Sequence, residues 1–279
     1  MLRNTNRFVI RGRGGDVRSR LDSIYHQYHS SRYLSFDPLV CVRKYSAPSH
    51  IELAGLFCSC LSYGRVEQII KSINTLIELM DCAVYRFVME SSLREKRARL
   101  RSFKHRFTTG YDIACLLEAA KQAIVTYGSL ENCALHHATD AQDSIVPAMA
   151  GFAAFFRAFG KKIHAGSGRS YAYLIPSPFE GSACKRLNMY FRWMVRPDDG
   201  IDFGIWRQFK PSQLVIPVDI HIMRAAKDLG LTRRKRAEWK TAVEITDNLR
   251  SVAPDDPVKY DFSLCRHGMA LFRKKINKS

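Results

Sequence analysis

The sequence predicts an all-α protein, and three observations support this fold class. Several long segments carry apolar residues at helical spacing, no alternating strand run of useful length occurs, and short Gly, Pro and Asp punctuation separates the segments. With 279 residues and 46% hydrophobic content, the chain can bury a substantial core, as one compact helical bundle or as two closely packed lobes.

The expected helices are read in chain order from their apolar periodicity and their punctuation. The second of them has Glu52 near its amino end and Gly64 as a terminator. The predicted helices span 21–34, 49–64, 65–80, 109–128 and 145–163, with one more beginning at Ser182 and a short one that starts at Asp219 and closes at Gly230.

The charge of the chain points to a polyanion as partner. Lysine and arginine total 44 against 26 acidic residues, a net charge of +18. Such a balance favours many phosphate contacts, so nucleic acid is the first partner to consider, although a basic soluble surface or a membrane-surface protein has the same composition. The stretch 92–107 carries seven lysines and arginines against one acid and is either a phosphate-contacting segment or an ordinary exposed helix.

Two further features of the sequence are its basic opening segment and its cysteines. Residues 1–20 are expected to form a basic, flexible arm ahead of a helical domain over 21–279, with an organelle presequence as the second interpretation. The opening lacks the apolar core of a secretion signal and no run of about 18 apolar residues occurs, which favours a cytoplasmic, nucleoid-associated protein. Eight cysteines lie mostly in apolar runs without paired C-x-x-C spacing, so we expect reduced cysteines, no metal and no cofactor.

The segment 174–230 carries the chemistry. A turn formed by Gly181, Ser182 and Ala183 can let a sugar–phosphate backbone approach the start of a helix, whose free N–H groups bind phosphate. A helix from Ser182 would place a polar face along Lys185, Asn188, Met189, Arg192 and Arg196. Asp219 stands where the next helix starts, and by spacing alone it is simply a helix cap, with Lys185 as one cation among many.

A specific resemblance favours a catalytic interpretation. The string FEGSACKR resembles the hairpin-to-helix turn of helix-hairpin-helix DNA glycosylases, in which a glycine precedes the catalytic lysine by four positions, as Gly181 precedes Lys185. The string VDIH resembles their V-D-x-H element, and the interval from Lys185 to Asp219 is similar to that of archaeal 8-oxoguanine glycosylases. Longer strings, including PSQLVIPVDIHIMRAAKDLGLT, are similar to an uncharacterised, mostly bacterial family of unknown function.

The resemblance implies a two-lobed helix-hairpin-helix glycosylase architecture and a repair activity on DNA. Lys185 would attack the sugar C1′ of a flipped-out nucleotide, and Asp219 would activate it and stabilise the sugar cation. An amine attacks only when unprotonated, so a catalytic lysine needs partial burial or nearby cations, for which Arg186 and Arg192 are candidates. The archaeal similarity implies an oxidised purine as substrate, released with strand cleavage.

Further residues are expected to contact the nucleic acid or the flipped base. The predicted nucleic-acid contacts are Gly181, Ser182, Ala183, Arg186, Arg192, His221 and Lys259. Trp206 and Phe203 are the candidates for a base pocket, although aromatic residues in such a segment are more often part of the core.

Two other classes of function stay open. One is a non-catalytic nucleic-acid-binding module on the same scaffold, and the other is an interaction subunit whose charge binds an acidic protein. A catalyst needs Lys185 and Asp219 within reach of one sugar carbon, whereas a binder needs only the basic surface. We expect DNA as the partner, and neither a membrane nor an obligate protein partner.

Overall fold

A computed structural model describes residues 14–136, 138, 143–164 and 168–276 of the chain. The predicted basic arm, residues 1–20, falls largely outside this range. Its last seven residues, 14–20, are helical, because the first helix begins at Gly14, seven residues before the predicted start. Residues 14–20 therefore belong to α1 and not to an arm.

The described chain is mainly helical, which confirms the all-α class. In the first half, most predicted helices are found within a few residues of their expected bounds. The elements are α1 (Gly14–Tyr28), the 3-10 helix η1 (Ser31–Phe36), α2 (Leu39–Val42), α3 (Pro48–Cys60), α4 (Val66–Leu79), α5 (Val84–Glu90), α6 (Leu93–Leu100), α7 (Gly110–Tyr127) and α8 (Leu130–His136).

The second half contains three α-helices, α10, α13 and α14, that the sequence analysis did not anticipate. The elements are α9 (Val146–Ile163), α10 (Arg169–Leu174), η2 (Pro178–Glu180), α11 (Lys185–Val195), η3 (Pro211–Gln213), α12 (Ile220–Asp228), α13 (Trp239–Arg250) and α14 (Asp261–Ile276). The described strands, β1 (Lys104–His105) and β2 (Thr108–Thr109), form a two-residue antiparallel hairpin in which His105 pairs with Thr108.

Local sequence signals set several of these boundaries. Thr109 and Asp112 form a capping box at the start of α7, each side chain bonding the backbone N–H of the other. The same helix ends at Tyr127 and is followed by the capping residue Gly128, whose φ of 87° is the left-handed conformation that glycine adopts without strain. Such signals act within one turn of helix, which explains why the helix bounds could be predicted from the sequence.

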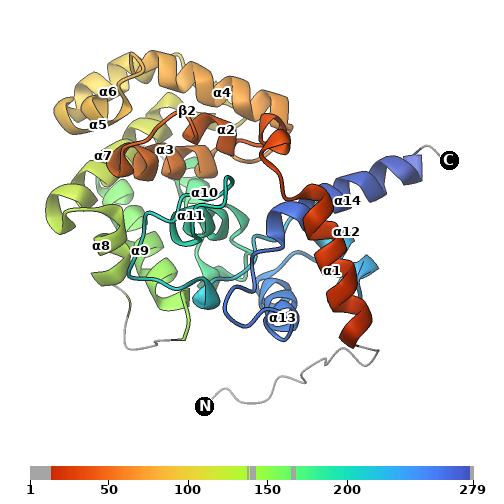
Figure 1. Cartoon of the computed structure of the whole chain (residues 1–279). Helices are drawn as coiled ribbons and strands as arrows, with labels where there is room; N and C mark the ends of the chain where they lie inside the picture. Colours follow the sequence, from red (N-terminus) through yellow and green to blue (C-terminus); the bar gives the residue numbers. More distant parts are fainter. Residues whose placement is uncertain (1–13, 137, 139–142, 165–167, 277–279) are drawn as a thin grey trace.

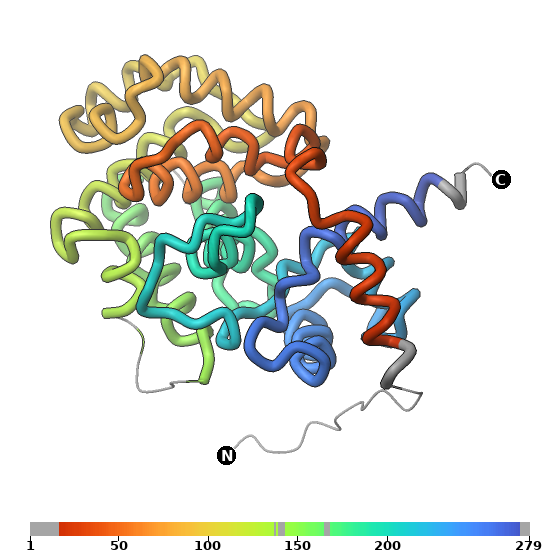
Figure 2. Tube along the Cα trace, viewed as in Figure 1, coloured from red at the N-terminus to blue at the C-terminus, as the bar shows by residue number. Residues whose placement is uncertain are grey.

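The helices fall into two groups that share one core. Helix α14 packs against α12 and against α1, so the first helix joins the C-terminal ones, while α3 and α6–α9 form the other group (Figure 1). Helix α11 lies between them and packs along α3, as the trace in Figure 2 also shows. Buried apolar residues from both groups form a single continuous cluster, which fixes the position of α11 in the middle of the molecule.

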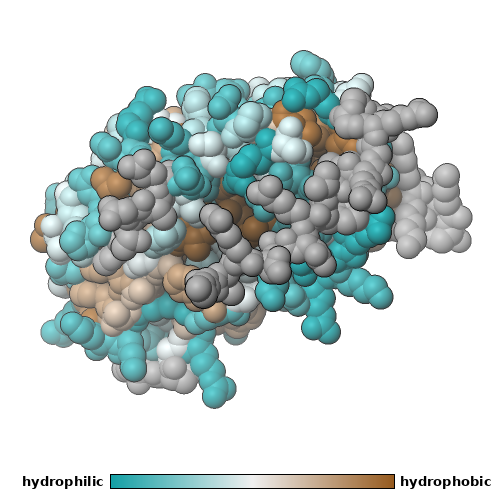
Figure 3. Space-filling model, turned by 90° about the horizontal axis from the view of Figure 1, so that it is seen from below, coloured by the Kyte–Doolittle hydropathy of each residue, from teal (hydrophilic) through white to brown (hydrophobic). Residues whose placement is uncertain are grey.

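On the face of the molecule drawn in Figure 3, hydrophilic residues predominate and apolar residues gather in a few patches. No helix in the described ranges has the length and apolar content needed to span a membrane. All eight cysteines are free, and six of them are buried, with Cys82 exposed and Cys265 partly exposed.

Candidate functional site

The turn before α11 is shaped by two residues with left-handed backbone. Gly181 has φ of 75°, and Cys184, the residue before the helix, has φ of 48°. Between them Ser182 pairs with Glu238 in an isolated bridge, and its hydroxyl accepts a hydrogen bond from the N–H of Cys184 (3.2 Å). The helix therefore begins at Lys185, three residues later than predicted, and Lys185 occupies its first position.

Asp219 caps α12, as the sequence predicted. Its Oδ1 accepts hydrogen bonds from the N–H groups of His221 (2.8 Å) and Ile222 (2.9 Å). Its second oxygen, Oδ2, is left for a different partner, the amine of Lys185, at 3.6 Å. One carboxylate thus serves the helix and the candidate site at the same time.

The amine of Lys185 is loosely held. Its Nζ lies 3.6 Å from Asp219 Oδ2 and 3.5 Å from the carbonyl oxygen of Ser62, just beyond α3. Both distances are longer than a strong charge-assisted hydrogen bond. The side chains of Lys185 and Asp219 are 32% and 21% exposed, so the pair is reachable from solvent at the junction of α11, α12 and the end of α3.

The surroundings keep the Asp219 carboxyl ionised. Burial by itself would raise its pKa, but the charge of Lys185 and the N–H groups of Ile222 and His221 outweigh burial, so its pKa is lowered. The pKa of His221 is also lowered, by burial and despite the nearby Asp219. Neutral His221 and ionised Asp219 are therefore the states expected near pH 7.

Arg186 places a buried positive charge beside Lys185. Its guanidinium donates to the carbonyls of Cys60 (3.0 Å) and Tyr173, and it lies 4.1 Å from the centre of the Tyr173 ring. Burial lowers the pKa of Arg186. Among the described residues no carboxylate lies within 4.0 Å of this guanidinium, so its charge is not neutralised locally.

Arg192 lies in a buried ion network and not on a DNA-facing surface. It forms ion pairs with Asp202 and Asp261, which are almost fully buried with it. The predicted polar face of α11 is mostly an internal one, because every residue from Arg186 to Val195 is buried. This burial corrects the predicted DNA contact at Arg192. Its charge, predicted to act on Lys185, is instead paired with Asp202 and Asp261.

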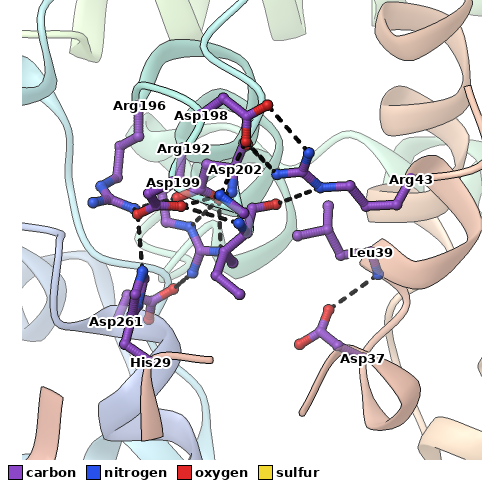
Figure 4. Close-up of polar contacts among 12 residues, drawn as sticks. His29, Asp37, Leu39, Arg43, Arg192, Arg196, Asp198, Asp199, Asp202 and Asp261 are labelled. Carbon is purple, nitrogen blue, oxygen red and sulfur yellow. Dashed lines mark hydrogen bonds and ion pairs between the residues drawn. The ribbon is translucent and has the colours of Figure 1, made fainter. Parts of the chain in front are cut away.

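The network extends from the carboxyl end of α11 to the loop 198–202, to His29 after α1 and to Asp261 of α14 (Figure 4). Arg196 pairs with Asp202 and with Asp199, and Asp199 in turn accepts from His29 of the segment after α1 at 2.9 Å. These contacts fix the far end of the helix that begins with Lys185. The acidic loop 198–202 therefore has a structural role.

The predicted base-pocket residues are also internal. Trp206 is 2% exposed, and its Nε1 donates to Glu52 at 2.7 Å. Phe203 is 8% exposed and is covered by the guanidinium of Arg43, 4.4 Å from the ring centre. Neither ring is available to stack a base, so this assignment is corrected; both residues pack in the core.

The contacts described for the Lys259 side chain are with two tyrosine rings and not with the pair. Its Nζ is 4.7 Å from the centre of the Tyr260 ring and 5.9 Å from that of Tyr25, on α1. Of the predicted site residues, the structure groups Lys185, Arg186, the turn 181–183, Asp219 and His221.

Gly268 is a residue of this site that the sequence analysis missed. A β-carbon at Gly268 would lie 2.1 Å from the carbonyl oxygen of His221, so only glycine lets α14 approach the start of α12 this closely. An isolated glycine in a helical pattern was the available signal, but it did not say which backbone comes close.

The described cavities do not coincide with the Lys185–Asp219 pair. A cavity of about 250 Å³ lies against α4, lined by residues that include Lys71 and Phe103, and not at Lys185. No cluster of His, Cys, Asp or Glu suited to a metal ion occurs in the described part of the chain.

Comparison with known proteins gives a family but no function. No curated protein and no solved structure matches the chain. A family model described as a protein of unknown function (DUF2400) matches residues 37–270, a range that includes both Lys185 and Asp219. The chain belongs to this family.

Proposed function

We propose that the protein is a DNA glycosylase with lyase activity, in which Lys185 is the nucleophile and Asp219 its acidic partner. The observation that carries the proposal is the contact of the two side chains across 3.6 Å, although they are 34 positions apart in the sequence. Both are partly exposed, and the resemblance to helix-hairpin-helix glycosylases assigns the same roles to these two positions.

The chemistry requires an amine and a carboxylate at one sugar carbon. The Lys185 nitrogen forms a bond to C1′ while the bond from C1′ to the base breaks and the base leaves with a proton. Opening of the sugar ring moves a proton to O4′ and leaves an imine between Lys185 and C1′. Loss of a proton from C2′ then expels the 3′ phosphate and cuts the strand. Ionised Asp219 would stabilise the positive charge that develops on the sugar.

The architecture and substrate are part of the same proposal. In this interpretation η2, Gly181 and α11 are the hairpin-to-helix turn, and the two groups of helices are the lobes beside the DNA. The turn 181–183 and His221 are the groups next to the pair that would meet a phosphate. The net charge of +18 supports binding to DNA, and an oxidised purine is the first base to test.

Borohydride trapping of the full chain on duplexes that carry 8-oxoguanine or an abasic site tests the chemistry. The wild type should form a covalent adduct, and Lys185→Ala should form none. Asp219→Asn should lower the yield by about 100-fold or more while leaving folding intact, because asparagine caps a helix as well as aspartate. Lys259→Ala, which removes a lysine that packs on Tyr260, is the matched control and should behave as wild type.

The result also separates the competing functions. An adduct that persists in Lys185→Ala would refute the assignment of the nucleophile. If no protein is trapped but the duplex is bound with strong salt dependence, base release without strand cleavage is the next measurement, and its absence would leave a nucleic-acid-binding module.

A further inference from the structure

Three aromatic rings form an exposed cluster beside Lys185, here called the aromatic shelf: Tyr63, Phe107 and Tyr173. The rings of Tyr63 and Phe107 are stacked with centres 5.1 Å apart, and Tyr173 meets both edge-on at 5.2 and 4.6 Å. Phe107 is 47% exposed and Tyr173 43% exposed. Large aromatic rings that pack on each other and stay open to solvent indicate a binding surface rather than core.

The backbone that presents Phe107 is strained and well anchored. Arg106, at the turn of the β1–β2 hairpin, has φ of 54°, a left-handed value that is costly for a residue with a side chain. On either side of the turn His105 and Thr108 are buried, and the hydroxyl of Tyr63 contacts the carbonyl of His105 (3.0 Å) and the hydroxyl of Thr108 (2.7 Å). The hairpin therefore holds the exposed ring in a defined place.

The aromatic shelf and the Lys185–Asp219 pair adjoin each other. Lys185 contacts the carbonyl of Ser62, the residue before Tyr63. Arg186, the residue after Lys185, lies 5.2 Å from the ring centre of Tyr63 and 4.1 Å from that of Tyr173. One side of the shelf is thus bound to the first turn of α11.

The surroundings of the shelf are positively charged. The guanidinium of Arg106 lies 5.9 Å from the ring centre of Tyr63, and the buried guanidinium of Arg186 lies beneath the same ring system without a carboxylate among the described residues within 4.0 Å. In the basic stretch 92–107, Lys96 pairs with Glu118, Arg97 donates to the carbonyl of Ile163 and Arg99 forms a surface pair with Asp81, whereas Arg106 is exposed beside the shelf. Exposed rings among cations fit a ligand that is flat and aromatic and carries phosphate.

We propose that the aromatic shelf stacks an unpaired nucleobase of the strand whose sugar meets Lys185, with Arg106 as the counter-charge for its phosphate. This inference rests on the proposed function for the position of the strand, and it replaces Trp206 and Phe203 by surface residues as the base-binding aromatics. Stacking on an aromatic side chain tolerates every base, so the shelf binds an unstacked base without choosing the lesion.

Binding of the full chain to a fully paired duplex and to the same duplex with one bulged 5-iodouracil tests the shelf. Measurements in a Lys185→Ala background separate binding from any covalent chemistry. Phe107→Ala should weaken binding of the bulged duplex by about 5- to 100-fold and leave the paired duplex within about 2-fold. Tyr173→Phe, which keeps the ring, should bind as well as its parent. Phe36→Ala is the matched control, because Phe36 is 63% exposed on η1.

Photocrosslinking gives a second readout that does not depend on affinity. The bulged 5-iodouracil should crosslink to the peptide that contains Phe107 or to the one that contains Tyr173. Equal effects of Phe107→Ala and Phe36→Ala, or crosslinks only elsewhere, would overturn the shelf even if borohydride trapping succeeds. Failed trapping with a selective loss in Phe107→Ala would refute the chemistry and leave the shelf standing. Absence of binding to both duplexes would overturn both and leave an apolar protein segment as the occupant to seek.

Discussion

Replacing Arg192 with methionine should destabilise the protein far more than an ordinary loss of an ion pair. Arg192 is 4% exposed, and its charge compensates Asp202 and Asp261, which are 0% and 7% exposed. Methionine fills a similar volume but leaves two buried carboxyl groups without this partner. Removing one member of a buried pair in this way costs about 3–5 kcal/mol.

The pH dependence of this loss follows from Asp261. Burial raises its pKa to about 6 even though Arg192 opposes the shift. A carboxyl whose pKa is raised in the folded state contributes stability below its ordinary pKa, and that contribution is lost as the pH rises through the folded value. Without Arg192 the pKa of Asp261 rises further. Each pKa unit of this rise adds about 1.4 kcal/mol to the free energy of unfolding that is lost at pH values above the folded-state pKa. The variant should therefore be closer to the wild type at pH 5 than at pH 8.

Urea unfolding of the wild type and the variant at both pH values measures the difference. Arg99→Met is the matched control, because Arg99 and its partner Asp81 are 49% and 64% exposed and such a pair contributes about 0–1 kcal/mol. Adding Asp261→Asn to Arg192→Met should restore part of the stability by removing an uncompensated charge. Equal losses in Arg192→Met and Arg99→Met, or a loss that grows toward pH 5, would refute the reasoning.

Two further substitutions test the packing around α11 and α9. Glu52→Gln should lower the free energy of unfolding by about 1–3 kcal/mol, because one amide oxygen cannot replace the carboxylate that accepts from Trp206 Nε1 and from two backbone N–H groups. The control Glu67→Gln, at an exposed position, should change the free energy of unfolding by less than about 0.5 kcal/mol. Gly160→Ala should lower the free energy of unfolding by about 1–3 kcal/mol, since the new methyl group would lie 1.9 Å from a ring carbon of Tyr171. Thermal or urea unfolding measures this loss, and a stability equal to that of the wild type would show that the ring moves freely.

The local part of the structure was predictable because its causes lie within a few residues. The helices over 49–64, 65–80, 109–128 and 145–163 follow from apolar spacing and caps, and all four are present with small shifts at their ends. Asp219 as the cap of its helix belongs to the same class, because the acceptor and the two N–H groups are at most three residues apart. The late start at Lys185 was missed, since it depends on the pairing of Ser182 with Glu238, far along the chain.

The sequence by itself determined the all-α class and the net charge of +18, and it supplied the amine and the carboxylate on which the proposed function rests. Only the tertiary structure decided which side chains are available. It brings Lys185 within 3.6 Å of Asp219, buries Trp206, and exposes Phe107 on a hairpin that no periodicity predicted. The physical reason is that exposure depends on which distant segments pack over a residue, and helical spacing carries no information about those partners.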